Sequence, residues 1–306
     1  MEKSSQPVIA FLVLLVVGCT STPPFPTEAR VALTYSSGRQ GEIEPCGCHA
    51  RPLGGVDREL NARAAMHSAE AVEFSLASGP QFLPATLSNQ KAALRKASYL
   101  SEAWKVLHTD VAAADARDFL FGAATFQTWA NASESSWISA NLYSGGRALF
   151  RPYVEKAYDD TTLRFFGVSG CGLAPQQHGV ECREPLRALR SALADAPPKG
   201  INILLSSLSG DEMEQVFQDF SDIAIVFNSP DGSALPGVVE EPGHRWLASP
   251  TPRGRALARV EFGRTVAEAV NSTVWIDASY AEPKNLLSDL VEKWRAAQHD
   301  AEVNGD

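Results

Sequence analysis

The sequence predicts an α/β fold, in which strands and helices alternate along the chain and pack in layers. Short apolar runs alternate with longer segments whose apolar residues recur at helical spacing. Two of the runs, at 201–206 and 223–227, are rich in apolar residues, which is typical of strands buried inside a sheet. Hydrophobic residues make up 44% of the chain and charged residues 21%, so we expect a globular protein with a sizeable core.

In the first half of the chain, strands are expected to be short and helices longer. The run at 31–35 ends in Ser-Ser-Gly, which indicates a strand that enters a loop. The segment 89–107 places apolar residues from Ala93 to Leu107 at helical spacing, which indicates a long helix. Further strands are expected at 71–76, 110–113 and 137–142. Further helices are expected at 58–68 and 125–131.

In the second half, 149–158 and 162–168 resemble the two strands of a hairpin. Helices are expected at 184–194 and 211–220, and late antiparallel strands at 246–249, 256–262 and 267–277. The segment 283–301 predicts an amphipathic terminal helix. Its apolar side carries Leu286, Leu287, Leu290, Val291 and Trp294.

The N-terminal residues 1–18 predict an export signal that is not part of the fold. Lys3 gives a positive start, and the apolar run that follows is too short to span a bilayer. The run ends in Val-Val-Gly-Cys, which is typical of a bacterial lipobox, so we expect Cys19 to be acylated and to anchor the protein stably. The alternative is a plain secretory signal with an incidental cysteine.

Residues 19–27 are expected to form the lipidated cysteine and a tether rich in Pro, Ser and Thr. The folded domain is expected over 28–301, including the terminal helix. Thr20, rather than an aspartate, follows the cysteine, which favours the outer over the inner membrane of a bacterial cell envelope.

The formal net charge is −9, which argues against a nucleic-acid partner because such partners favour a basic face. The same acidity argues against binding anionic headgroups. We therefore expect the protein to meet the membrane through its N-terminal lipid. A protein or small-molecule partner stays open.

Several segments carry a family resemblance through their order and spacing. They lie at 33–41, 54–58, 77–82, 114–119, 139–142, 165–170, 204–208 and 226–231. Together they resemble the N-terminal domain of the 5′-nucleotidase and metallophosphoesterase (calcineurin-like) superfamily. The likeness is greatest to its exported members with a Cys-Gly-Cys after the first motif. The resemblance spans 31–277 and implies a four-layer α-β-β-α sandwich in a single domain.

The positions where the resemblance places metal ligands hold other residues in this chain. Family enzymes bind two metal ions with Asp, His and Asn ligands. In-line attack on phosphate requires that the charge on both the attacking water and the leaving oxygen is neutralised. The corresponding residues here are Gly38, Gln40, Pro80, Ala116, Arg117, Ser206 or Ser207, and 228–231. Gly, Pro and Ala offer no side-chain donor, and the permanent cation Arg117 would repel a divalent metal. The dinuclear phosphatase site is therefore expected to be lost.

Polar residues left in the former cleft are candidates for binding. They are Gln40, Arg117, Asp118, Asn141 and Asp231. If the alignment with the family motifs is shifted by one or two residues, at most Asp118 or Asp231 falls on a ligand position. Asp115, Arg117 and Asp118 are also expected to form an ion-pair network of structural value. The family's nucleotide-recognising C-terminal domain is not expected, since the chain stops soon after Asp277.

The cysteines of the folded domain are further residues with reactive or metal-binding side chains. They are Cys46, Cys48, Cys171 and Cys182. An exported protein favours disulfides. Cys171 and Cys182 bracket a short loop and would join easily, but pairs that cross between the two loops also remain open. If the fold of the resemblance holds, all the thiols lie at one mouth with His49 and His178. Two further hypotheses then follow, a single zinc site or a redox-active dithiol.

We expect a lipid-anchored envelope protein that is non-catalytic and uses the former cleft for binding or scaffolding. One alternative is a metal-dependent phosphohydrolase with a rebuilt metal site at the cysteines. Another is a redox partner of exported electron-transfer proteins through the Cys-Gly-Cys.

Overall fold

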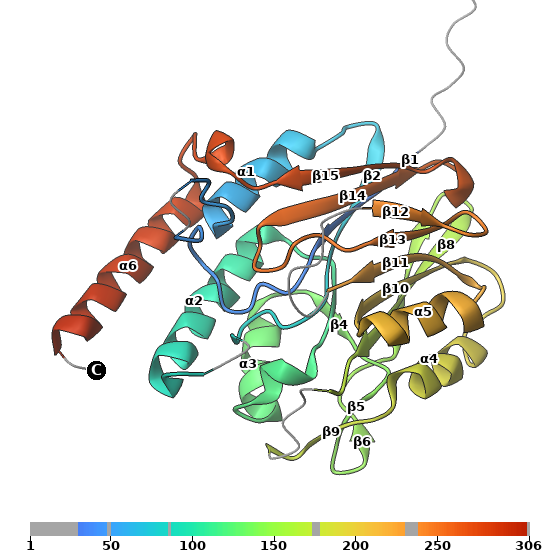
Figure 1. Ribbon diagram of the computed structural model, residues 1–306, viewed down its shortest axis with the longest axis horizontal. Coiled ribbons are helices and arrows are strands. Elements are labelled where there is room, and N and C mark those ends of the chain that lie inside the picture. The colour runs from blue at the N-terminus through green and yellow to red at the C-terminus, as the bar shows by residue number, and fades with distance from the viewer. Residues whose placement is uncertain (1–29, 48–49, 85–86, 173–177, 230–237, 305–306) are drawn as a thin grey trace, which may run out of the picture.

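The computed structural model describes residues 30–47, 50–84, 87–172, 178–229 and 238–304. Two six-stranded sheets pack face to face, and helices cover the outer face of each, so the architecture is a four-layer α-β-β-α sandwich (Figure 1). The fold class predicted from the sequence is confirmed.

The first sheet has the order β15-β14-β1-β2-β3-β4. Its strands are β1 (Arg30–Ser36), β2 (Ala71–Ala77), β3 (Val111–Ala113), β4 (Ser136–Ile138), β14 (Ala256–Phe262) and β15 (Val270–Trp275). Strands β1 to β4 are parallel, whereas β14 runs antiparallel to both β1 and β15.

The second sheet has the order β12-β13-β11-β10-β8-β7. Its strands are β7 (Tyr153–Tyr158), β8 (Thr161–Ser169), β10 (Ile201–Ser207), β11 (Ile223–Asn228), β12 (Val238–Glu241) and β13 (Arg245–Ala248). Strands β8, β10, β11 and β13 are parallel, and the edge strands β7 and β12 are antiparallel to their neighbours. A small third sheet joins β5 (Leu142–Ser144), β6 (Arg147–Ala148) and β9 (Val180–Cys182).

The helices divide between the two outer faces. The first sheet is covered by α1 (Val56–Met66), α2 (Gln90–Leu107), α3 (Ala123–Ala132) and α6 (Leu286–Asn304), and the second by α4 (Pro185–Ala194) and α5 (Gly210–Asp219) (Figure 1). Short 3-10 helices are η1 (Ala116–Phe119), η3 (Val266–Glu268) and η4 (Ala278–Tyr280). Among the described helices, none combines the length and the apolar composition that a bilayer crossing requires.

The main core lies between the sheets. Leu33 and Tyr35 of β1 meet Phe165 of β8 and Phe227 of β11 in one buried cluster, and the rings of Tyr35 and Phe227 lie 4.9 Å apart. Because both sheets bury their inner faces against each other, they share one core, as the layers of a single domain do.

Local signals explain the best-predicted elements. Helix α2 begins after Asn89, whose side chain accepts from the backbone N–H of Ala92 at 3.0 Å. Helix α5 begins with a capping box of Ser209 and Glu212. The predicted hairpin is also confirmed, with Tyr153 of β7 opposite Phe166 of β8.

Two expectations are wrong. The predicted strand at 137–142 is split between β4 and β5, because Ser139 and Ala140 leave the first sheet and donate to the carbonyls of Arg151 and Gly167. The segment at 246–249 is not simply antiparallel, since β13 pairs antiparallel with β12 but parallel with β11. Strands β6, β9 and β12 were not predicted.

Candidate functional site

The candidate site lies at the carboxyl ends of the parallel strands, where loops from both sheets converge. Gly38 follows β1, and its backbone N–H donates to Oγ of Ser229, which follows β11, at 2.9 Å. Ser78 follows β2, and its Oγ donates to the backbone carbonyl of Ser206 in β10 at 2.6 Å. These bonds tie the two sheets together at the edge where the resemblance places the metal ions.

Packed backbone and small side chains fill the positions where the resemblance places metal ligands. A Cβ on Gly38 would lie 2.8 Å from Cδ of Pro80 and 2.9 Å from Oγ of Ser229, so a ligating side chain has no room there. Within the ranges that the structure describes, no three His, Cys, Asp or Glu side chains come together as metal ligands. The residues present do not fit the two metal ions that the resemblance implies.

Gln40 joins two of the converging loops. It has a positive φ of 53° and is buried, and its N–H donates to the carbonyl of Pro80 at 2.8 Å. Its Oε1 accepts from Nε of Arg253 at 3.2 Å. Gln40 therefore fixes the loop after β1 against Arg253, a residue of the β13–β14 loop.

Asp118 is a fully buried carboxylate in η1. It accepts backbone hydrogen bonds from Gln81 at 2.7 Å and from Phe82 and Leu83 at 3.0 Å each. Burial raises the pKa of Asp118 to about 7, and the nearby Asp115 acts in the same direction while the amide bonds oppose the shift. The carboxylate thus shapes the loop after β2.

Of the network of Asp115, Arg117 and Asp118 expected from the sequence, Asp115 and Arg117 form an ion pair, and Asp118 accepts from backbone amides. The guanidinium of Arg117 donates from Nε to Oδ1 at 2.7 Å and from Nη2 to Oδ2 at 2.8 Å. Asp115 is 1% exposed, so the carboxylate of this bidentate pair is shielded from water.

Asn141 is a structural bridge. Its Nδ2 donates to the carbonyls of Ser169 and Arg183 at 2.7 and 3.0 Å, and its Oδ1 accepts from the N–H of Ser169 at 2.9 Å. The buried amide therefore connects the end of β8 to the third sheet.

Cys171 and Cys182 form a disulfide with their Cα atoms 5.6 Å apart. The short-loop pairing is therefore the one that the fold adopts, and disulfides from either cysteine to the first loop are excluded. Because both sulfurs are in this disulfide, neither is a thiol that could bind a metal or form a different redox pair. Cys46 is half-buried, and its Sγ accepts from the N–H of Leu53 at 3.3 Å. His178 is exposed.

Four predicted site residues lie outside the described residues. They are Cys19, Cys48, His49 and Asp231. A metal or redox site built from the Cys-Gly-Cys and its histidine therefore stays a prediction.

A buried network of Arg39, Glu59 and Arg63 links the loop after β1 to helix α1. Arg39 is 2% exposed and pairs through Nη2 with Glu59 of α1, which is wholly buried. Arg63 donates to the other oxygen of Glu59 from Nε at 3.0 Å and from Nη2 at 2.7 Å. The two guanidinium groups outweigh the cost of burial and hold the pKa of Glu59 below its ordinary value.

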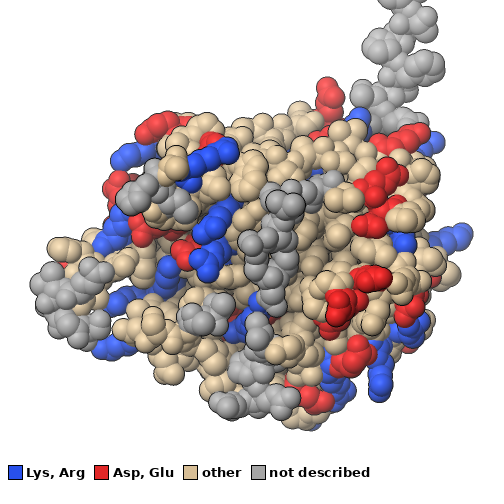
Figure 2. Space-filling view, viewed as in Figure 1, with Lys and Arg blue, Asp and Glu red and all other residues tan. Residues whose placement is uncertain are grey.

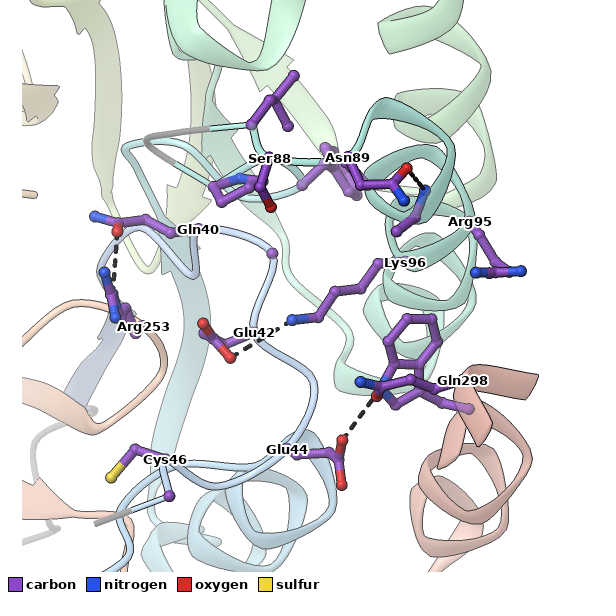
Figure 3. Close-up of a pocket in the computed structure, with 18 of the residues that line it drawn as sticks. Gln40, Glu42, Glu44, Cys46, Ser88, Asn89, Arg95, Lys96, Arg253 and Gln298 are labelled. Carbon is purple, nitrogen blue, oxygen red and sulfur yellow. Dashed lines mark hydrogen bonds and ion pairs between the residues drawn. The ribbon is translucent and has the colours of Figure 1, made fainter. Parts of the chain in front are cut away.

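A cavity of about 650 Å³ opens beside these loops. Its walls come from the loop after β1, the start of α2, the β13–β14 loop and α6 (Figure 3). Figure 3 shows Gln40 and Arg253 on one side, and Lys96 reaching from α2 toward Glu42, with Nζ 3.6 Å from Oε2. The volume lies in the range of small-molecule sites.

Sequence reasoning missed most of this cavity. It singled out Gln40 and Cys46, which line it, but not Arg253, Arg255 or Trp294. The one available signal was the pair of arginines in the turn-rich segment 250–255. Trp294, which the sequence places on the apolar side of the terminal helix, is buried, whereas Leu286 of the same predicted side is 77% exposed.

Comparisons with solved structures identify the fold. The sulfate thiohydrolase SoxB of Thermus thermophilus matches with a TM-score of 0.74 at 14% identity, over 89% of this chain and 61% of that chain. A putative 5′-nucleotidase of Staphylococcus aureus matches with a TM-score of 0.71 at 12% identity, over 87% of this chain and 58% of that chain. The calcineurin-like phosphoesterase YfkN of Bacillus subtilis matches with a TM-score of 0.68 at 10% identity, over 88% of this chain and 98% of that chain.

Neither a protein-family model nor the sequence of a curated protein matches the chain. The chain spans about three fifths of the first of these structures, and at such low identity the likeness concerns the fold alone. The fold expected from the resemblance is confirmed: the chain is a single domain with the metallophosphoesterase (calcineurin-like) fold.

Proposed function

We propose that this protein is a lipid-anchored binding protein of the bacterial cell envelope, with a metallophosphoesterase fold but without dinuclear metal catalysis. In this role the fold supplies a rigid scaffold, and the loops at the carboxyl ends of its strands supply the binding surface.

The observation that carries the proposal is the packing at Gly38. Its amide is bonded to Ser229, and a Cβ at Gly38 would lie 2.8 Å from Cδ of Pro80, so the loops that would have to surround metal ions touch each other instead. Asp118, a buried carboxylate against the loop after β2, accepts hydrogen bonds from three backbone amides of that loop. In-line phosphoryl transfer depends on metal-held oxygens, and this donor set supplies no substitute.

The cavity beside the former metal cleft supports a binding role. Its lining combines apolar and aromatic side chains with polar and charged ones, and it lies among the same converging loops. A fold that has lost catalytic groups while keeping a formed cavity can still bind a ligand or a partner.

The anchor rests on the N-terminal sequence. The lipobox that ends at Cys19 and the tether that follows would hold the domain at the membrane surface through acyl chains. Thr20 favours the outer membrane, and the acidic charge of the chain disfavours nucleic acid as a partner.

The test is an assay of the purified full chain with bis(p-nitrophenyl) phosphate and with nucleoside monophosphates in added manganese. The 5′-nucleotidase of Thermus thermophilus, which shares the fold, serves as the positive control. We expect no hydrolysis above the rate without protein. Metal-dependent turnover that follows the protein through purification would refute the non-catalytic role.

A further inference from the structure

The cavity between the loop after β1, α2 and α6 holds an excess of positive charge. Its cationic lining residues are Arg95, Lys96, Arg253 and Arg255, and its acidic ones are Glu42 and Glu44. This excess stands out in a chain whose formal net charge is −9. Figure 2 shows Lys and Arg side chains gathered over the part of this face formed by α2 and α6.

Both acids of the cavity already have cationic partners. Glu42 lies 3.6 Å from Nζ of Lys96. Glu44 accepts from Nε of Arg295 at 2.6 Å and from Nε1 of Trp294 at 3.2 Å. Each acid of the cavity therefore has a cationic partner other than Arg253 and Arg255.

Those arginines lack an acidic partner in the part of the chain that the structure describes. Arg253 donates to the neutral amide of Gln40, and no described carboxylate lies within 4.0 Å of Arg253 or Arg255. Nε of Arg255 is buried and has no described hydrogen-bond acceptor. Arg255 is half-buried and lines the cavity, so an anion that contacted its accessible nitrogens would meet a less hydrated guanidinium than that of an exposed arginine.

The rest of the lining favours an apolar body next to the charge. Phe82, Pro84, Leu87 and Ala93 give the cavity an apolar wall, and Trp294 adds an aromatic face. The first turn of α2, which has no acidic residue, also borders the cavity and directs the positive end of its helix dipole there.

We propose that this cavity binds a small amphipathic anion, with a carboxylate or phosphate group at Arg253 and Arg255 and an apolar or aromatic body against the wall of Pro84, Leu87 and Trp294. This inference rests on the proposed binding function and names its ligand class. A cavity of about 650 Å³ has room for a molecule larger than a free inorganic anion.

Isothermal titration calorimetry of the purified full chain with three matched probes tests the inference. 1-Naphthoate and 1-naphthyl phosphate carry the two anionic groups, and 1-naphthamide is a neutral analogue of the same body. We expect at least one of the anions to bind about tenfold more tightly than the amide, because charge-assisted hydrogen bonds exceed neutral ones. The stronger of the two anions identifies the group as carboxylate or phosphate.

Substitutions locate the binding. Arg253→Gln and Arg255→Gln should each weaken the anion about fivefold to tenfold and change the amide less than twofold. Arg255→Lys should retain part of the anion's affinity, and Ala92→Phe, which narrows the cavity, should weaken all three probes. Arg187→Gln, an exposed arginine of α4, is the matched control and should change nothing. Thermal melting confirms that each variant is folded.

The outcomes separate the inference from the proposed function. Equal affinity for the amide and both anions, or unchanged anion binding in the arginine variants, would overturn the anion site and leave the binding role standing. Absence of binding by every probe would overturn the inference together with the binding role of this cavity. Release of 1-naphthol from 1-naphthyl phosphate would instead refute the non-catalytic function.

Discussion

Replacing Glu59 with glutamine tests whether the buried charge network holds the loop after β1. Glu59 is wholly inside the protein and accepts from both Arg39 and Arg63. Glutamine keeps the shape but removes the negative charge, so Arg39, at 2% exposure, is left as a buried cation without compensation. Breaking a buried pair by removing one partner costs about 3–5 kcal/mol.

The free energy of unfolding is measured by urea denaturation at pH 7, followed by tryptophan fluorescence. We expect Glu59→Gln to lower it by about 3 kcal/mol or more. Glu102→Gln, an exposed acid on α2, is the matched control and should stay within about 0.5 kcal/mol of wild type. In the double variant Arg39→Met/Glu59→Gln the loss should be smaller than the sum of the two single losses, because the uncompensated cation is gone.

A loss below about 1 kcal/mol for Glu59→Gln would refute this reasoning. Strict additivity in the double variant would do the same. Since the pKa of Glu59 is held below its ordinary value, its contribution is present at neutral pH and is lost as the pH falls through the lowered pKa. The difference between wild type and Glu59→Gln should therefore shrink in acid.

Three further predictions concern packing, the disulfide and pH. Gly38→Ala should lower the unfolding free energy by about 1–3 kcal/mol, because its Cβ meets a proline and a serine at 2.8 and 2.9 Å, whereas Gly47→Ala, with open space around it, should be neutral in the same urea assay. Replacing both Cys171 and Cys182 with serine should cost about 3 kcal/mol by urea denaturation, and an unchanged midpoint would contradict a stabilising role for this disulfide. Because the pKa of Asp118 is raised from 3.8 to about 7, the folded protein binds a proton that the unfolded chain releases, so stability should fall as pH rises through this window, by about 4 kcal/mol at most. Melting temperatures between pH 4 and 8 should show this slope in wild type and not in Asp118→Asn.

The sequence predicts elements well where their signals are local. Helix α2 begins within one residue of the expected start, because the Asn89 cap and the apolar spacing both lie inside the segment. The split between β4 and β5 could not be predicted in the same way. It depends on the carbonyl of Arg151, which precedes β7, and on that of Gly167 in β8, which the fold brings to Ser139 and Ala140.

At the site, too, features that depend on single residues can be predicted, whereas features that depend on the fold cannot. The lack of a side-chain ligand at Gly38 and Pro80 could be seen in the sequence, because neither residue type has a side-chain donor in any conformation. The environment of Asp118 could not, since it requires the loop after β2 to present three amides to η1. The cavity arginines belong to no motif, and only the folding of the β13–β14 loop against Gln40 brings Arg253 to the site.

The most direct test of the central claim, that this metallophosphoesterase fold has lost its dinuclear metal site, is manganese titration of the purified full chain followed by electron paramagnetic resonance. Free Mn²⁺ gives a sharp spectrum that disappears on binding. The packed positions at Gly38, Pro80 and Ser229 predict that the free signal rises in proportion to added metal from the first addition. Saturable loss of the signal with a stoichiometry of two ions per chain would contradict the account.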